Sequence, residues 1–92
     1  MTAPERTRDS ALFLTLVAQL MQMAMIALGK IINPATGKTA VDLTQARDFI
    51  DMLLALQTRT QGNLSDEERQ MLERAVNELR MMFVDEERKA AG

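Results

Sequence analysis

The chain has 92 residues, a formal net charge of −2, and no cysteine, histidine, tryptophan or tyrosine. This composition excludes disulfides, thiolate metal sites and histidine-based acid–base catalysis, so we expect no cofactor and no metal. Without a strongly basic segment or aromatic stacking platforms we expect no nucleic-acid partner, and the lack of cysteine fits the reducing cytoplasm, which is the location we expect.

Helix-breaking residues divide the chain into three periodic segments. The glycines and prolines all lie outside these segments or at their ends, which predicts three helices and no strand. We expect an all-α, three-helix fold in which one long apolar helix precedes an αα-hairpin. A polar N-terminal tail is expected over residues 1–8, a single helical domain over residues 9–88 and a C-terminal tail over residues 89–92.

The first segment, residues 11–28, is apolar except for Thr15, Gln19 and Gln22. On a helix these three residues fall within a narrow arc, so every other side of the helix is apolar. Two further helices with one apolar face each cannot cover such a helix completely. We therefore expect a homo-oligomer built around this helix, most simply a two-fold dimer.

The expected interface lies along one side of the first helix. Its candidate residues follow a 4-3-4 spacing: Leu16, Leu20, Met23 and Ala27. The glutamines at positions 19 and 22 have two interpretations. They can pair across a symmetric interface and fix its register, as polar core residues do in coiled coils, or they can form the only solvent-exposed line of the helix.

The same apolar run raises the question of a membrane. Its length is at the lower edge for a span, it contains two glutamines, and the residues before it balance positive and negative charge. We therefore expect neither a membrane span nor a signal peptide. Binding of an apolar ligand or of a membrane surface remains the alternative function.

The loop after the first helix contains Gly-Lys-Thr at residues 37–39. This run matches the end of a phosphate-binding loop, but that pattern needs glycine where Ile32 stands and follows a strand. We predict instead a turn that begins at Asn33, with Gly37 in the left-handed conformation. Ile31 and Ile32 are expected to pack back against the helices.

A second helix is predicted over residues 43–60, with one apolar face. Asp42 is its predicted N-cap, and Gln45 completes the pattern of a capping box. Asp48 and Asp51 share the opposite face, where we expect solvated carboxylates rather than an acid–base pair.

A third helix is predicted over residues 66–87, where Ser65 and Glu68 form the pattern of a capping box. The link to the second helix is so short that the two must form an antiparallel hairpin. Gly62 is the predicted structural cap at the end of the second helix, in the left-handed conformation.

Four segments resemble the small bacterial proteins catalogued as domain of unknown function 1844. They are L-G-x-x-x-N-P-x-T-G at residues 28–37, D-L-x-x-A-R-x-x-I-D-x-L at residues 42–53, T-R-T-Q-G-N-L-S-D-E-E at residues 58–68 and L-R-x-x-F-V at residues 79–84. The chain departs from the family at Gln61, where a lysine-like residue is expected, and in its methionine-rich first helix. The resemblance implies a self-standing helical module and brings no activity, cofactor or partner.

The sequence contains no residues that predict catalysis or ligand binding. Met21 and Met25 share a helix face, but methionine commonly fills irregular apolar gaps and no histidine or cysteine accompanies them as a metal ligand. We expect a non-enzymatic, self-associating interaction or structural module. Its expected partner is a second copy of itself, with an unidentified protein as a further possibility.

Overall fold

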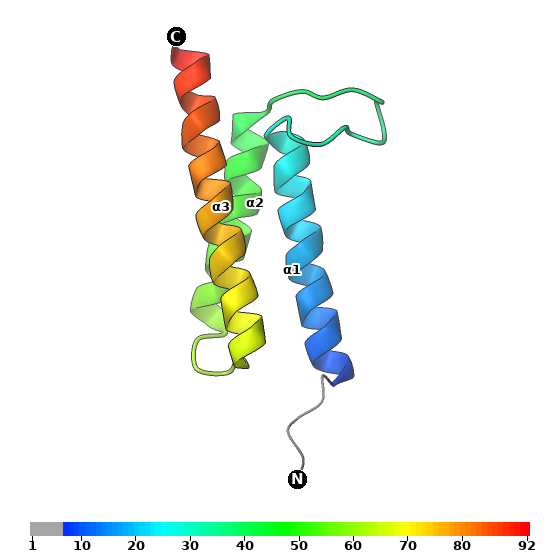
Figure 1. Cartoon of the computed structure of the whole chain (residues 1–92), viewed down its shortest axis with the longest axis vertical. Coiled ribbons are helices and arrows are strands. Elements are labelled where there is room, and N and C mark those ends of the chain that lie inside the picture. The colour runs from blue at the N-terminus through cyan, green and yellow to red at the C-terminus, as the bar shows by residue number, and fades with distance from the viewer. Residues whose placement is uncertain (1–6) are drawn as a thin grey trace.

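The computed structural model describes residues 7–92, which form three helices (Figure 1): α1 (Arg8–Ala27), α2 (Leu43–Arg59) and α3 (Asp66–Ala91). Helices α2 and α3 form an antiparallel hairpin, and α1 packs against both. Within residues 7–92 there is no strand, only two isolated bridges in the loop between α1 and α2. The three-helix, all-α prediction is confirmed.

Local hydrogen bonds define where α2 and α3 begin. The Ser65 side chain accepts from the Glu68 backbone N–H at 3.2 Å, and the Glu68 carboxylate accepts from the Ser65 N–H at 2.8 Å, so the predicted capping box is present. Asp42 caps α2 by accepting from the Gln45 N–H at 3.0 Å. The reciprocal half of that predicted capping box is absent, because the Asp42 N–H donates to the Ala27 carbonyl at 2.7 Å.

The end of α1 turns the chain back toward α2. Gly29 adopts φ +75° and donates to the Ile26 carbonyl at 3.0 Å, while the Lys30 N–H donates to the Met25 carbonyl at 2.9 Å. These two bonds form a Schellman motif, which requires a residue that tolerates positive φ. A Cβ at position 29 would also lie 2.9 Å from Val41 Cγ2, so glycine fits this position for two reasons.

The core lies between the three helices and is entirely apolar among the described residues. Alanines at the helix crossings let the backbones approach closely, and branched side chains fill the space between them. The buried cluster comprises Val17, Ala24, Ala27, Leu28, Ala46, Ile50, Leu53, Leu72, Ala75, Val76 and Leu79.

One ion pair joins the end of α1 to α3. Lys30 Nζ lies 2.8 Å from Glu86 Oε2, and Lys89 Nζ lies 3.2 Å from the same oxygen. The hydrogen bond from Lys30, followed by that from Lys89, holds the pKa of Glu86 below its ordinary value. α3 itself continues to Ala91 rather than ending near Glu87, and this extension brings Lys89 within reach of Glu86.

Candidate self-association surface

One face of α1 is apolar and points away from α2 and α3. Leu12, Leu16 and Met23 are 51%, 42% and 48% exposed, although each is a large apolar side chain. Isolated exposed apolar residues are common, but three on one line of one helix form a continuous surface. In a single copy of this chain, that line of α1 remains in water.

Five residues on the outer side of α1 follow the spacing of a coiled-coil seam. Steps of four, three, four and three residues connect Leu12, Leu16, Gln19, Met23 and Ile26, which we call the α1 stripe. The first four are exposed and Ile26 is half-buried. Apolar residues at this spacing form the contact line when two helices pack along their length.

A shallow apolar groove adjoins the α1 stripe on the side of α2. It encloses about 310 Å³ and is lined by Leu16, Leu20, Met52, Ala55, Leu56 and Arg59. Met52 is 47% exposed, and Arg59 is the one charged residue of this α1–α2 groove. The groove widens the apolar surface from one helix to two.

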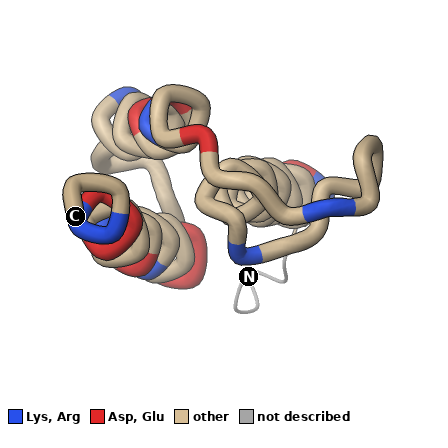
Figure 2. The backbone as a smooth tube through the Cα atoms, turned by 90° about the horizontal axis from the view of Figure 1, so that it is seen from above, with Lys and Arg blue, Asp and Glu red and all other residues tan. Residues whose placement is uncertain are grey.

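The α1 stripe also differs from the rest of the surface in charge. No charged residue occurs between Ser10 and Ala27. Figure 2 shows Lys, Arg, Asp and Glu distributed along α2 and α3, whereas the tube of α1 is almost entirely uncharged. A surface without charge neither attracts a charged partner nor repels a second copy of itself.

The structure distributes the four predicted interface residues between two environments. Leu16 and Met23 lie on the exposed face, and Leu20 is half-buried in the α1–α2 groove. Ala27 is only 3% exposed and belongs to the core of a single chain, because the returning loop covers it through the bridge between Leu28 and Val41. A surface built on α1 therefore excludes Ala27.

Several members of the surface were not predicted, among them Leu12, Ile26 and Met52. Leu12 is one four-residue step before Leu16, so extending the same spacing would have found it. Met52 lies beside α1 only because of the rotation of α2 about its own axis, and no local pattern records that rotation.

The polar residues of α1 are exposed in a single copy. Gln19 lies in the middle of the α1 stripe, and its amide makes no hydrogen bond with any residue that the structure describes. Gln22 is also exposed and lies at the edge of the stripe. Thr15 differs, because its hydroxyl donates to the Ala11 carbonyl at 2.8 Å.

A second apolar patch lies on α3, where Met81 is 73% exposed and Val84 is 49% exposed. Unlike the α1 stripe, this patch is bordered by charged side chains, including Arg80 and Arg88. It therefore resembles an ordinary solvated surface, and it supplies control positions for tests of α1.

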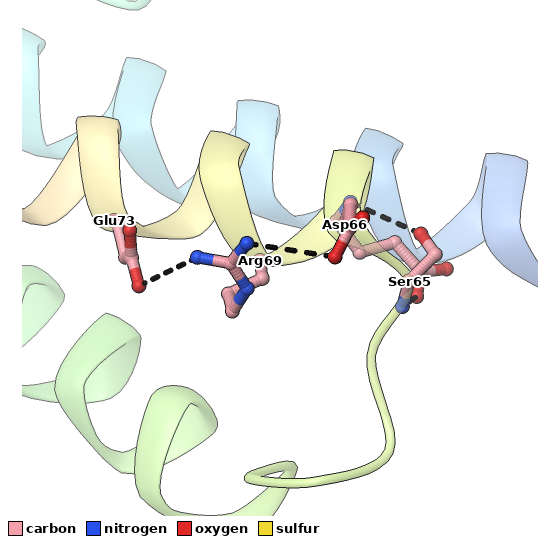
Figure 3. A network of polar contacts seen from close by, with 5 residues as sticks. Ser65, Asp66, Arg69 and Glu73 are labelled. Carbon is pink, nitrogen blue, oxygen red and sulfur yellow. Dashed lines mark hydrogen bonds and ion pairs between the residues drawn. The ribbon is translucent and has the colours of Figure 1, made fainter.

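The start of α3 holds a polar network (Figure 3). Arg69 lies 3.5 Å from Asp66 and 3.3 Å from Glu73. Both carboxylates pair with the guanidinium of Arg69, which lines a pocket of about 480 Å³ at the end of the hairpin. Hydrogen bonds from the Ser10 hydroxyl and then from the Ser65 backbone lower the pKa of Glu68. This network stabilises the helix start and pairs the guanidinium that faces the pocket with two carboxylates.

The loop between α1 and α2 forms the predicted turn. The Asn33 carbonyl accepts from the Gly37 N–H at 2.8 Å, and Gly37 has φ +73°. Ile31 is half-buried, but the prediction for Ile32 is wrong, since it is 57% exposed. The bridge between Asn33 and Lys38 closes a tight turn that projects sideways from the bundle and carries Ile32 away from the core (Figure 1).

The other residues considered in the sequence analysis lie in the core, on the solvated surface or in a turn. Met21 and Met25 pack against the core, and Asp48 and Asp51 are exposed. Among the residues described, no three histidine, cysteine or acidic side chains form a group that could hold a metal ion. Gly62 has the predicted positive φ, +86°, but the cap of α2 is Thr60, and Gly62 lies two residues later in the turn that the Asn63 N–H closes on the Thr60 carbonyl.

One helix in the described part of the chain, α1, is long and apolar enough to cross a membrane by length and composition. Both a core helix of a soluble protein and a signal sequence also satisfy that criterion. The criterion therefore does not separate a span from a helix that packs against other helices.

Comparison with family models gives a match over residues 10–86 to the family described as Domain of unknown function (DUF1844). The match covers most of the chain and confirms the resemblance carried by the four segments. Comparison with curated proteins and with solved structures finds no match.

Proposed function

This chain belongs to the family described as Domain of unknown function (DUF1844), and we propose from its structure that it is a non-enzymatic helical module that self-associates. The surface for this association is the α1 stripe together with the α1–α2 groove. The partner in the proposal is a second copy of the chain, and association completes the covering of α1.

The exposure of Leu12, Leu16 and Met23 on one uncharged line is the observation that supports this proposal. Covering a half-exposed Leu or Met side chain yields about 1 kcal/mol. Three such residues, with Met52 beside them, therefore contribute several kcal/mol, which is comparable with the stability of a small domain. A closed two-fold arrangement covers the same patch on both copies at once.

A second candidate function is binding of an apolar ligand or a membrane surface through the same face. The observation in its favour is that α1 satisfies the length and composition of a spanning helix. Against it, α1 carries no basic residue between Ser10 and Ala27 with which to bind anionic headgroups. Sedimentation with vesicles of zwitterionic and of anionic lipid distinguishes the two proposals, since a self-associating module stays in the supernatant.

Two matched variants test self-association. Leu16→Glu places a charge on the α1 stripe, where burial in an interface is costly, and Met81→Glu places the same charge on the exposed patch of α3. We expect light scattering to give a monomer for Leu16→Glu and an unchanged oligomer for Met81→Glu, with both variants retaining their helical circular dichroism. Equal masses for the two variants would contradict the proposal.

A further inference from the structure

We propose that two copies of the chain pair antiparallel along α1, with the two-fold axis passing beside Gln19. This inference rests on the proposed self-association and adds the geometry of the pair. The amide of Gln19 is the group that sets the axial register.

The order of apolar and polar residues in the α1 stripe is the same in both directions, and the spacing differs by one residue on reversal. Gln19 is at its centre, with two apolar residues before it, Leu12 and Leu16, and two after it, Met23 and Ile26. Reversing one copy about Gln19 therefore places apolar residues opposite apolar residues and the amide opposite the amide. In that arrangement Leu12 faces Ile26 of the second copy, and Leu16 faces its Met23.

Gln19 is the one residue of the α1 stripe that requires a hydrogen-bonding partner when covered. A primary amide is both a donor and an acceptor, so two copies related by a two-fold axis satisfy each other. Within residues 7–92 the amide makes no hydrogen bond, whereas the Thr15 hydroxyl is already bonded to the Ala11 carbonyl. Any other axial alignment places Gln19 against Leu16 or Met23, where its amide is buried without a partner at a free-energy cost.

The antiparallel direction follows from the helices that accompany α1. Within one chain α1 is antiparallel to α2 (Figure 1). A second α1 antiparallel to the first continues this alternation across the pair, in the order α2, α1, α1 and α2. The dipoles of the two α1 helices then oppose each other, whereas parallel pairing would align them.

The uncharged face of α1 is as long as the α1 helix of a second copy. A 20-residue helix is about 30 Å long and about 10 Å wide, so α1 alone offers a footprint of about 300 Å². The adjoining α1–α2 groove adds Met52 and Ala55 of α2 to this footprint. The uncharged surface gives a second copy nothing to repel.

The absence of cysteine makes disulfide cross-linking a direct test, because one introduced thiol reports one contact. Under mild oxidation Gln19→Cys is expected to give a disulfide-linked dimer. An equal mixture of Leu12→Cys and Ile26→Cys chains is expected to cross-link about tenfold faster than either variant alone. In the antiparallel pair two copies of residue 12 lie about 20 Å apart along the helix axis, too far for a disulfide.

The outcomes separate this inference from the proposed function. A monomeric wild-type chain by sedimentation velocity overturns both. If the wild-type chain is a dimer but Leu12→Cys cross-links with itself as fast as with Ile26→Cys, the antiparallel geometry is wrong and the proposed self-association still holds. If the wild-type chain is a dimer but Gln19→Cys does not cross-link, the two-fold axis does not pass beside Gln19.

The role of Gln19 in setting the register needs a separate comparison. In a Gln19→Leu background the register is expected to slip, so a mixture of Leu12→Cys and Met23→Cys chains gains cross-linking about fivefold. Gln22→Leu removes an equivalent amide at the edge of the stripe and is expected to keep the wild-type pattern. The same pattern in both backgrounds would show that Gln19 does not set the register.

Discussion

Helices α1 and α3 both contribute to the same core, yet the surfaces that they expose to water differ in charge. The outer side of α3 carries arginines and carboxylates, including the i,i+4 pairs Arg69–Glu73 at 3.3 Å and Lys89–Asp85 at 3.4 Å. The outer side of α1 carries leucines, methionine and glutamines without a single charge between Ser10 and Ala27. The outer side of α3 is typical of a solvated helix apart from Met81 and Val84, whereas the outer side of α1 is uncharged and largely apolar.

The largest expected effect on stability comes from the buried side of α3, and a substitution on the exposed side of α1 provides the contrast. Leu79 is fully buried, so Leu79→Ala should lower the free energy of unfolding by about 2–5 kcal/mol through lost burial and the cavity left behind. This loss should not depend on protein concentration. Leu16→Ala should lower the melting temperature by an amount that shrinks as the protein is diluted, because dilution removes the association between copies from the wild type as well. Thermal unfolding of the wild type and both variants at two protein concentrations checks this difference, and urea unfolding gives the free-energy loss for Leu79→Ala.

The turn that leads into α3 gives the next largest effect. Gly62 has φ +86° and open space around the position of a Cβ, so backbone strain alone opposes a side chain there. Gly62→Val should lower the free energy of unfolding by about 1–2 kcal/mol, because a β-branched residue is disfavoured in the left-handed region. Thermal unfolding measures the loss. A change within experimental error would mean that the turn takes another conformation in solution.

The smallest expected effect concerns the ion pair between α1 and α3. Lys30 lowers the pKa of Glu86 in the folded chain, so this carboxylate stabilises the fold above its unfolded pKa of about 4.5. That contribution is lost as the pH falls through the lowered folded pKa. In Glu86→Gln the stability should therefore vary less with pH between about pH 5 and pH 3 than in the wild type. Identical pH profiles would show that the pair does not contribute.

The sequence predicted what depends on neighbours along the chain. The caps at Ser65 and Asp42 and the left-handed glycines are encoded within a few residues, and the structure confirms them. The burial of Ala27 and the exposure of Ile32 depend on the path of the returning loop, which local patterns do not determine. The spacing along α1 therefore predicted where an apolar surface lies but not which of its residues the chain itself already covers.

The mass of the wild-type chain in solution tests the central claim most directly. Sedimentation velocity across low to high micromolar concentration should give a species of twice the 10.3 kDa chain mass, dissociating only on dilution. A single species at the mass of one chain over the whole range, with cooperative unfolding, would contradict the claim that α1 is covered by a second copy.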